Sequence, residues 1–376
     1  MKTYSRTMSD GNVARTAQIV GSDKPLRIKT IAMPDLPPDM VRIKVAYAGI
    51  CHSDLHLIDE ADSVENELGI DRQGMVLGHE ISGIVEEIGK DVQDNIFAIG
   101  DDVIVCPWKG CCQCEACKIG QNNQCTNNPA GKEDIGQSVN HPGGYQSHIN
   151  VHPDFLLKVR GALPLDVACM LPCSASTVYS LLRKLEKFLL TAAERSGSSA
   201  RLLVIGAGGL GLWAITLAKA MFNNVHITVA DIDQSKLGLA KESGADDVAV
   251  IDRKASPEES KDFITKTGMY CAVIDLVGSS STAKIAVSSL QTGGAMVLVG
   301  LFGGELNCPL SMIISKSISI FGHRTAARKD TAETMKLAIE KKLKFPKLQY
   351  IDHDDINKAL EDLVKGRIQG RCLIKY

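Results

Sequence analysis

One short stretch near the middle of the chain limits the fold more than any other feature. The four apolar residues Leu202 to Ile205 run directly into a glycine-rich turn, and residues 212–221 then have helical character. A second apolar run follows and ends at Asp231, 20 residues beyond the last glycine of the turn. Strand, turn, helix and strand in this order make a βαβ unit, whose two strands lie parallel in one sheet.

The same alternation of strand and helix continues downstream. Residues 236–244 are predicted to form a helix, and helical segments separate the later apolar runs. Strands that alternate with helices in this way predict an α/β fold, a doubly wound parallel sheet with helices on both faces. The further strands are expected at Val225–Ala230, Val248–Ile251, Ala272–Val277 and Met296–Val299.

The glycine-rich turn is a candidate phosphate-binding site. Its GxGxxG spacing is carried by Gly206, Gly208, Gly209, Leu210 and Gly211. The motif alone is weak evidence, but here it follows an apolar strand and begins a helix, and the acidic residue Asp231 follows 20 residues after its last glycine. The backbone would approach a pyrophosphate at the helix N-terminus, and Asp231 would accept hydrogen bonds from the adenine ribose. A carboxylate there repels a 2′-phosphate, and the neighbouring Ile232 is no compensating arginine, so the pattern favours NAD over NADP.

The residues before about 160 have a different character. Apolar and polar residues alternate between 13 and 50, and prolines interrupt them, which is typical of short antiparallel strands. Residues 75–85 and 103–106 continue the β-rich pattern, and no long helical period appears before about residue 165. The first domain is therefore expected to be β-rich and barrel-like.

The pattern changes again on either side of the parallel sheet. A helix is expected over 168–189 with Cys173 near its start, and a surface loop over 191–200. After residue 321 two amphipathic helices are expected, over 329–342 and 355–366, and then a strand over 371–375. We expect this tail to return to the first domain. The predicted domains are residues 1–176 and 322–376 for the β-rich domain and 177–321 for the parallel sheet.

Composition narrows the classes of partner. A chain of 376 residues is longer than a single hydrophobic core usually supports, so about two domains are expected. Its formal charge of −2 does not indicate nucleic acid or an anionic membrane as a binding partner. No uncharged run predicts a membrane-spanning helix, and the first twenty residues contain no apolar core of a secretory signal. Twelve cysteines in a chain of this kind favour metal ligation over disulfides, and the cytoplasm is the expected location.

Four of the cysteines are clustered on one predicted loop. Spacings of two, two and seven intervening residues would bring four thiolates together, enough for a closed tetrahedral site that holds a structural zinc. Cys112 could compete for the metal but its spacing fits worse, and Cys106 is interpreted as a bystander. The four predicted ligands are Cys111, Cys114, Cys117 and Cys125.

A second, open metal site is predicted from residues far apart in the sequence. Cys51, His79 and Cys173 form a Cys₂His set, which leaves a fourth position on a catalytic zinc. Such a zinc lowers the pKa of a bound alcohol, so that an alkoxide forms near neutral pH. Ser53 and then His56 could carry the proton to solvent. A carboxylate against a metal-bound histidine fixes its tautomer, and Asp54 is the candidate.

These motifs, taken in this order, resemble the zinc-containing alcohol dehydrogenases of the medium-chain dehydrogenase/reductase family. The resemblance covers nearly the whole chain from about residue 15, and the segments 107–117 and 299–303 look most like the NAD-dependent microbial branch. It implies a GroES-like catalytic domain in two segments around a Rossmann domain. It also implies two zinc ions per chain, NAD as cofactor, and a homo-oligomer, either a tetramer or a dimer.

The resemblance further implies roles for single residues. His52 and Arg371 match contacts to the cofactor pyrophosphate, and Lys236 matches a contact near the adenine ribose. Glu80 joins Asp54 among the carboxylates around the catalytic zinc. The remaining matches are Thr177 and Val299 for the cofactor and Trp108 for a wall of the substrate pocket.

The predicted function is reversible hydride transfer between a primary or secondary alcohol and NAD⁺, giving an aldehyde or ketone. One alternative is a zinc-independent reductase of enones or quinones in the same family, which the three zinc ligands argue against. Another is a non-enzymatic NAD-binding structural protein, which would need no proton relay. The sequence leaves open the alcohol, the physiological direction and the number of subunits, and it assigns no role to the N-terminal arm.

Overall fold

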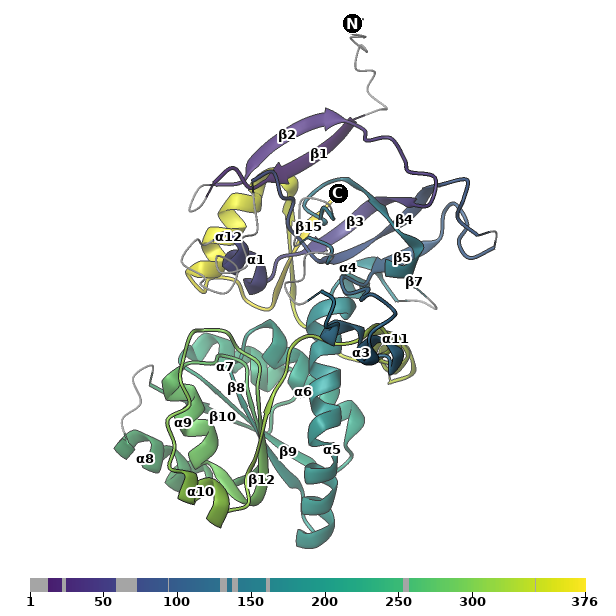
Figure 1. The fold of residues 1–376 in the computed structure, drawn as a ribbon. Helices are drawn as coiled ribbons and strands as arrows, with labels where there is room; N and C mark the ends of the chain where they lie inside the picture. The colour runs from purple at the N-terminus through teal and green to yellow at the C-terminus, as the bar shows by residue number, and fades with distance from the viewer. Residues whose placement is uncertain are drawn as a thin grey trace, which may run out of the picture. The chain divides into compact units, whose positions relative to one another are not determined.

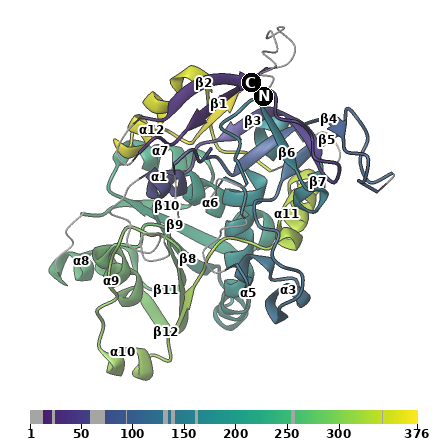
Figure 2. The same ribbon diagram turned by 45° about the horizontal axis from the view of Figure 1, so that its top comes forward.

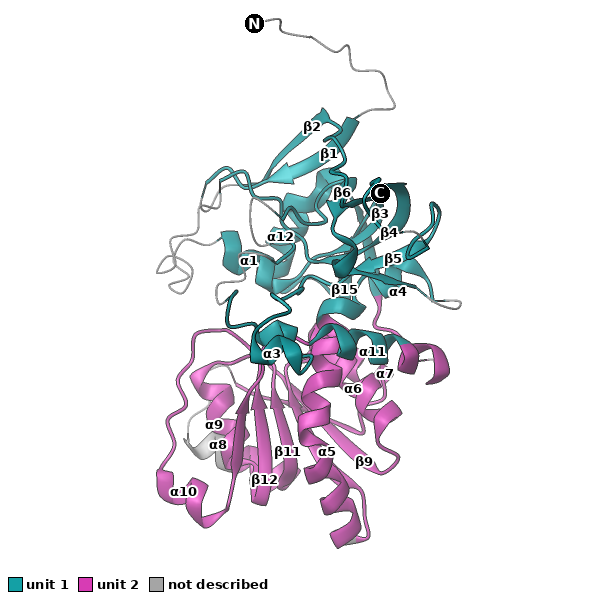
Figure 3. Ribbon diagram, turned by 45° about the vertical axis from the view of Figure 1, so that its right-hand side comes forward, with its two compact units in different colours: residues 1–173, 327–335, 348–376 teal, residues 174–326, 336–347 magenta. Residues whose placement is uncertain are grey.

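The structure is a computed structural model that describes residues 13–21, 25–58, 73–93, 95–128, 134–136, 141–159, 163–252, 257–341 and 343–376. The chain divides into two compact units, which Figure 3 shows in different colours. Unit 1 comprises the residues up to 173 together with 327–335 and 348–376, and unit 2 comprises 174–326 and 336–347. The predicted domain boundaries at 176 and 321 stay predictions.

Unit 1 is built on a seven-stranded sheet with the strand order β14-β15-β3-β4-β5-β7, in which β6 also pairs with β3. All pairs are antiparallel except β14 with β15. β1 and β2 form a separate two-stranded ladder. The strands are β1 Val13–Gln18, β2 Arg27–Ala32, β3 Val41–Gly49, β4 Glu80–Ile88, β5 Asp102–Val105, β6 His148–Val151, β7 Leu156–Lys158, β14 Leu348–Asp352 and β15 Arg371–Lys375.

Short helices fill the connections of unit 1 (Figure 1). Their bounds are α1 His52–Ile58, α3 Glu115–Lys118, α4 Leu165–Ala168, α12 Ile356–Val364 and the 3₁₀ turns Asn122–Gln124, Pro153–Phe155 and His353–Asp355. α12 lies beside the β1–β2 ladder in both Figure 1 and Figure 2. Asn357 on this helix accepts from the amide of Leu26 at 2.7 Å and donates to its carbonyl at 2.9 Å. The late helix is thereby fixed to the residue that precedes β2.

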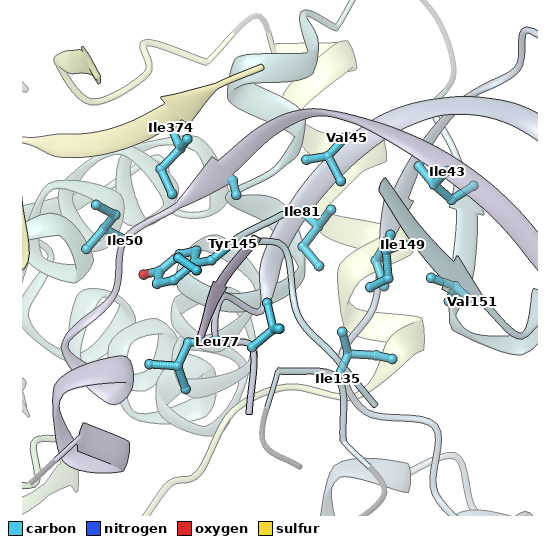
Figure 4. Packing of buried hydrophobic residues seen from close by; sticks show 14 of the residues in the cluster. Ile43, Val45, Ile50, Leu77, Ile81, Ile135, Tyr145, Ile149, Val151 and Ile374 are labelled. Carbon is cyan, nitrogen blue, oxygen red and sulfur yellow. The ribbon is translucent and has the colours of Figure 1, made fainter. Parts of the chain in front are cut away.

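The hydrophobic core of unit 1 is formed by the apolar side chains that alternate with polar ones along its strands. β3 buries Val41, Ile43 and Val45 on one face, because successive side chains of a strand point to opposite sides. Figure 4 shows Ile43 and Val45 among other residues of this cluster, which includes the fully buried Tyr145. The predicted β-rich first domain is confirmed.

Unit 2 contains a six-stranded parallel sheet with the order β10-β9-β8-β11-β12-β13. In chain order this is 3-2-1-4-5-6, the doubly wound arrangement of dinucleotide-binding proteins, and the predicted α/β fold is confirmed. The central strand β11 is buried at every position, as a strand covered on both faces requires. The strands are β8 Ala200–Ile205, β9 Val225–Asp231, β10 Asp247–Val250, β11 Tyr270–Asp275, β12 Leu290–Leu298 and β13 Ser319–Gly322.

Helices separate the parallel strands of unit 2, as the alternating pattern predicted (Figure 1). One further helix, α11, begins in residues grouped with unit 1 and ends in residues grouped with unit 2. The helices are α5 Ser176–Ser196, α6 Gly209–Met221, α7 Gln234–Glu242, α8 Pro257–Thr267, α9 Ser280–Ser288, α10 Leu310–Ser315 and α11 Arg328–Lys341.

The loop expected over residues 191–200 is wrong. Helix α5 continues to Ser196, and only residues 197–199 separate it from β8. The helix ends because Gly197 adopts a left-handed conformation with φ of 61°. The serines and the glycine gave the stretch a loop-like composition, but the preceding Thr-Ala-Ala-Glu-Arg run is compatible with a helix.

The helix expected over 168–189 is displaced toward the C-terminus. α4 ends at Ala168, residues Leu171–Ala175 form a single π-helical turn, and α5 starts only at Ser176. Cys173 therefore lies in the π turn and not in a regular helix. Among the residues that the structure describes, no helix is long and apolar enough to cross a membrane.

Candidate active site

The first predicted zinc ligand lies where a strand changes into a helix. β3 ends at Gly49, Cys51 follows, and α1 begins at His52. The amide of Cys51 donates to Oδ2 of Asp54 at 2.9 Å, and the amide of Asp54 donates back to the Cys51 carbonyl at 3.1 Å. This closed turn fixes the buried thiol at the start of the helix.

Strand pairing brings the second ligand beside the first. β3 and β4 are antiparallel with Gly49 opposite Glu80, so His79, the residue before β4, lies next to the end of β3. The π turn supplies Cys173, whose Sγ is 3.2 Å from Nε2 of His79. The ligand atoms of Cys51, His79 and Cys173 all lie within 4.8 Å of one another, and all three residues are buried.

This donor set fits a zinc ion. Ligand atoms about 2.0–2.3 Å from one tetrahedral ion lie roughly 3.3–3.8 Å apart, which small side-chain adjustments of this cluster reach. The side chain of Cys173, and after it His79, lowers the pKa of Cys51 well below its usual range, although burial opposes this. A lowered pKa favours the thiolate, which is the form that binds metal.

The carboxylate of Asp54 lies beside the ring of His79. Oδ1 is 3.2 Å from Nδ1 of His79, and the role of this acid in fixing the tautomer stays a prediction. Oδ2 accepts the hydroxyl of Tyr145 at 2.8 Å as well as the amide of Cys51. Sequence reasoning missed Tyr145, which is 91 residues from Asp54 along the chain and carries no motif of its own.

Glu80 and Arg371 form a buried ion pair. Burial raises the pKa of Glu80 and the guanidinium of Arg371 opposes that effect. The pair joins the start of β4 to the start of β15, two strands that are 291 residues apart at this point. Both residues belong to unit 1, and the pairing of one with the other was not predicted.

The candidate relay residues lie along α1. Oγ of Ser53 is 3.7 Å from Sγ of Cys51, so a hydroxyl lies directly beside a predicted zinc ligand. His56 follows three positions later on the same helix, a spacing that puts both side chains on one face. Ser53 and His52 are exposed and His56 is half-buried.

Trp108 is close to the predicted zinc ligands. Its ring centroid lies 6.1 Å from that of His79, and its side chain is almost fully buried. Asn122 donates to the carbonyl of Trp108 and accepts from the amide of Arg328 at 3.2 Å. The backbone of Trp108 is thus held by the same loop that carries the four clustered cysteines.

The four-cysteine loop is assembled as predicted. The sulfur atoms of Cys111, Cys114, Cys117 and Cys125 lie within 4.8 Å of one another. Sγ of Cys111 accepts from the Cys114 amide at 3.3 Å and from Nδ2 of Asn127 at 3.2 Å, and such donors favour a thiolate. Backbone amides, that of Cys117 first, also lower the pKa of Cys114 to about 5. The set suits a closed zinc site, which excludes the exposed Cys112.

The glycine-rich turn of unit 2 has the backbone geometry that its sequence requires. Gly206 has a φ of +105°, and a Cβ at Gly211 would lie 2.0 Å from the Gly206 carbonyl. Oδ2 of Asp231 accepts the Ala207 amide at 2.6 Å, and Oδ1 accepts the Asp233 amide at 2.9 Å. The acid at the end of β9 is therefore fixed against the turn, with lone pairs left for a ligand.

The other predicted cofactor residues of unit 2 occupy three separate positions. Thr177 is buried in the first turn of α5, and its carbonyl accepts from Nε2 of His323 at 3.1 Å. Lys236 is half-buried on α7, and Val299 directly follows β12. Four further cysteines lie outside both clusters: Cys169, Cys271 and Cys372 are buried and Cys308 is half-buried.

Two protein-family models match the chain, one over residues of unit 1 and one mainly over residues of unit 2. A family model for the alcohol dehydrogenase GroES-like domain matches residues 37–161. A second model, for zinc-binding dehydrogenases, matches residues 209–340. An NAD-dependent alcohol dehydrogenase from Sulfolobus acidocaldarius is 34% identical over 94% of this chain and 96% of its own length. The chain belongs to the zinc-containing alcohol dehydrogenases.

Solved structures place the chain in the same family of alcohol dehydrogenases. The crystal structure of an alcohol dehydrogenase from Aeropyrum pernix superposes with a TM-score of 0.82 and 29% identity, covering 96% of this chain and 100% of that one. An acetophenone reductase from Geotrichum candidum, solved in complex with NAD, superposes with a TM-score of 0.78 and 26% sequence identity. The match covers 96% of this chain and 97% of that one. The GroES-like and Rossmann folds expected from the resemblance are confirmed, and both zinc sites of such an alcohol dehydrogenase are present in unit 1.

Proposed function

We propose that this NAD-dependent alcohol dehydrogenase interconverts a primary or secondary alcohol with its aldehyde or ketone and releases the alcohol proton through Ser53 and His56. The observation that carries the proposal is the Ser53 hydroxyl, 3.7 Å from a thiol of the buried Cys51–His79–Cys173 cluster. A hydroxyl beside an open metal position is where the proton of a bound alcohol would leave. A zinc-independent reductase, the alternative function, would not require the three metal-binding side chains of this cluster.

The residues around the metal have two separate chemical roles, metal binding and proton transfer. Zinc held by Cys51, His79 and Cys173 would act as a Lewis acid on the alcohol oxygen. Ser53 accepts the hydroxyl proton of the alcohol and donates its own to His56, whose imidazole can exchange with solvent. Burial of the three ligands limits water at the reacting centre.

The proton relay is tested by steady-state NAD⁺ reduction as a function of pH. Ser53→Ala is expected to lower kcat about 100-fold, the usual size of a lost proton-transfer step. Ser53→Thr keeps the hydroxyl and is the matched control. His56→Gln should lose activity below neutral pH and be rescued by added imidazole. Full activity of Ser53→Ala at every pH would exclude the relay.

The nucleotide site is proposed in unit 2 with NAD as its ligand. The turn from Gly206 to Gly211 would hold the pyrophosphate, and Asp231 would bind the ribose hydroxyls, since its carboxylate is already fixed against the turn. The further contacts proposed from the family are Lys236 at the ribose, Thr177 and Val299 along the cofactor, and His52 and Arg371 at the pyrophosphate.

Cofactor preference has a direct test. Asp231→Ser removes the charge that repels a 2′-phosphate and the acceptor for the ribose. We expect the KM for NAD⁺ to rise at least about tenfold and the KM for NADP⁺ to fall, because a charged hydrogen bond contributes about 1.5–3 kcal/mol. An unchanged ratio of the two KM values would remove Asp231 from the site.

The substrate pocket is proposed to have Trp108 as one wall, because its indole lies 6.1 Å from the His79 ring. An aromatic wall packs well against flat or apolar alcohols. The acetophenone reductase with a similar fold acts on an aromatic ketone. A panel of primary, secondary, benzylic and polyol alcohols with Trp108→Ala ranks the classes, and loss confined to benzylic and long-chain alcohols is expected.

A homo-oligomer is proposed, and unit 2 offers the surface. Leu301, Phe302, Leu310 and Ile314 are each between 71% and 75% exposed, and all lie in the segment between β12 and the last strand of the sheet, β13. Apolar side chains beside a sheet edge favour pairing with a second copy. Ile314→Glu and Phe302→Glu should lower the mass measured by light scattering. An unchanged mass for both variants would place the interface elsewhere.

Metal content separates the enzyme from its alternatives. Two zinc ions per chain in the wild type, and one with lost activity in Cys51→Ser, are expected. One zinc in the wild type with unchanged activity in the variant would favour the zinc-independent reductase, and absence of NAD⁺ reduction with every alcohol would favour a structural NAD-binding protein. Location in the cytoplasm remains a prediction from the sequence.

A further inference from the structure

One oxygen of the Asp54 carboxylate is occupied by two donors. The hydroxyl of Tyr145 lies 2.8 Å and the amide of Cys51 2.9 Å from Oδ2. The second oxygen, Oδ1, is left to Nδ1 of His79 at 3.2 Å. Two donors on one oxygen set the rotation of a carboxylate group, so the direction of Oδ1 depends on them.

The donor Tyr145 is itself held from several sides. Its amide donates to the carbonyl of Leu77 at 2.9 Å, and its carbonyl accepts from the amide of Ala17 at 2.9 Å. The ring lies against Gly78, where a Cβ would be 2.5 Å from the ring carbon Cδ1. Figure 4 shows the ring inside the core of unit 1 with its oxygen on the side of Ile50, the neighbour of Cys51. The hydroxyl therefore cannot move away without repacking the core.

The phenol acts as a donor in this contact. Burial, and after it the Asp54 carboxylate, raises the pKa of Tyr145 well above its usual range, so the hydroxyl keeps its proton. A buried carboxylate oxygen that accepts from both a phenol and an amide is held in one orientation.

We propose that Tyr145 is a positioning residue of the catalytic metal site, which acts through Asp54 on His79. With Oδ2 occupied by the phenol, Oδ1 is the oxygen that faces Nδ1 of His79 at 3.2 Å, and a carboxylate on that side favours a proton on Nδ1 and leaves Nε2 for the metal. Tyr145 touches neither ligand nor substrate in this role. The inference rests on the proposed function only in that Cys51, His79 and Cys173 hold the zinc.

The test compares Tyr145→Phe with Tyr376→Phe in the full, zinc-loaded chain. Tyr376 is a matched control, because its hydroxyl also donates inside unit 1, to the Gly144 carbonyl at 3.0 Å, without touching Asp54. Zinc retained per chain is measured against a graded series of chelator concentrations, and Cys51→Ser identifies which loss belongs to the catalytic site. Partners of ligand histidines usually contribute 10- to 100-fold in metal affinity.

Tyr145→Phe is expected to weaken the catalytic zinc about tenfold while the four-cysteine zinc stays unchanged. Cobalt in the catalytic site should show a shifted visible absorption spectrum in Tyr145→Phe and an unshifted one in Tyr376→Phe. Equal effects of both variants, or no effect of Tyr145→Phe on affinity and spectrum, would overturn the proposal. A wild type that holds only one zinc would instead contradict the proposed function.

Folding of the variant has its own control. The Phe ring keeps the packing against Gly78, and the circular dichroism of the variant should match the wild type. If Tyr145→Phe does not fold, 3-fluorotyrosine at position 145 keeps both ring and hydroxyl. Its fluorine resonance is then expected to shift when the catalytic zinc is removed, and a resonance that does not move would overturn the proposal.

Discussion

Position 49 has room for a hydrogen atom but not for a methyl group. A Cβ there would lie 2.1 Å from Oε2 of Glu80 and 2.9 Å from its Cβ. Because Glu80 holds the buried guanidinium of Arg371, Gly49→Ala should displace one partner of a buried ion pair. Loss of such a pair costs about 3 kcal/mol, and the thermal unfolding midpoint should fall accordingly.

Gly238 provides the control for that substitution. It lies on α7, and nothing stands within 4 Å of a Cβ built there. Gly238→Ala should therefore keep or raise the midpoint, since alanine favours a helix by about 0.5–1 kcal/mol. Equal midpoints for the two variants would show that Glu80 accommodates the methyl group without loss.

His323 in unit 2 predicts a pH dependence of stability. Burial, and after it the charge of Lys184, lowers the pKa of His323 from 6.5 to about 4. Above pH 6.5 both the folded and the unfolded chain carry a neutral imidazole. Between pH 6.5 and 4 only the unfolded chain takes up the proton, so stability is lost as the pH falls, by up to about 3 kcal/mol.

Comparison with His323→Gln isolates this group from the many others that titrate. The amide of glutamine can still donate to the Thr177 carbonyl, which His323 contacts at 3.1 Å. The difference between the unfolding midpoints of wild type and variant should shrink from pH 7.5 to pH 5. A difference that stays constant over that range would contradict the lowered pKa.

At the scale of elements, the four-cysteine loop is expected to depend on its metal. α3 has no buried residue, and the loop around it is closed by sulfur contacts and backbone hydrogen bonds. Cys114→Ser is therefore expected to lower the zinc content from two to one per chain and to expose residues 111–125 to limited proteolysis. Zinc analysis and mass spectrometry of the fragments measure both effects.

Cys112 is the matched control on the same loop. It is exposed, lies outside the cluster and has a φ of 58°, where a non-glycine residue costs roughly 1 kcal/mol. Cys112→Gly should keep two zinc ions and leave stability equal or higher. A lost zinc in Cys112→Gly would make this thiol a ligand after all.

For the whole molecule, the two units predict two unfolding transitions. Unit 1 and unit 2 each have a hydrophobic core of their own. Zinc binds residues of unit 1, and the proposed NAD turn belongs to unit 2. In scanning calorimetry, a chelator should lower one transition, and NAD⁺ at 100 times its Kd should stabilise the other by about 2.7 kcal/mol. A single transition that responds to both would show that the units unfold together.

The cysteine loop and the glycine-rich turn could be predicted from the sequence, because residues close together in the chain determine them. The spacing of Cys111 to Cys125 closes one loop, and the glycine turn follows from backbone geometry at Gly206 and Gly211. Errors arose where two local signals competed. The serines near Gly197 suggested a loop, but the helix continued until the left-handed glycine ended it.

The sequence by itself determined the fold class, the types of metal ligand and the nucleotide turn, because periodicity, ligand chemistry and glycine geometry act over short distances. Only the tertiary structure decided which further side chains contact the predicted Asp54 and Glu80 at the catalytic site. The register of β3 against β4 places Gly49 opposite Glu80, and the packing of the core brings Tyr145 to Asp54 across 91 residues. Such contacts depend on strand register and side-chain packing over the whole unit, and no local pattern encodes them.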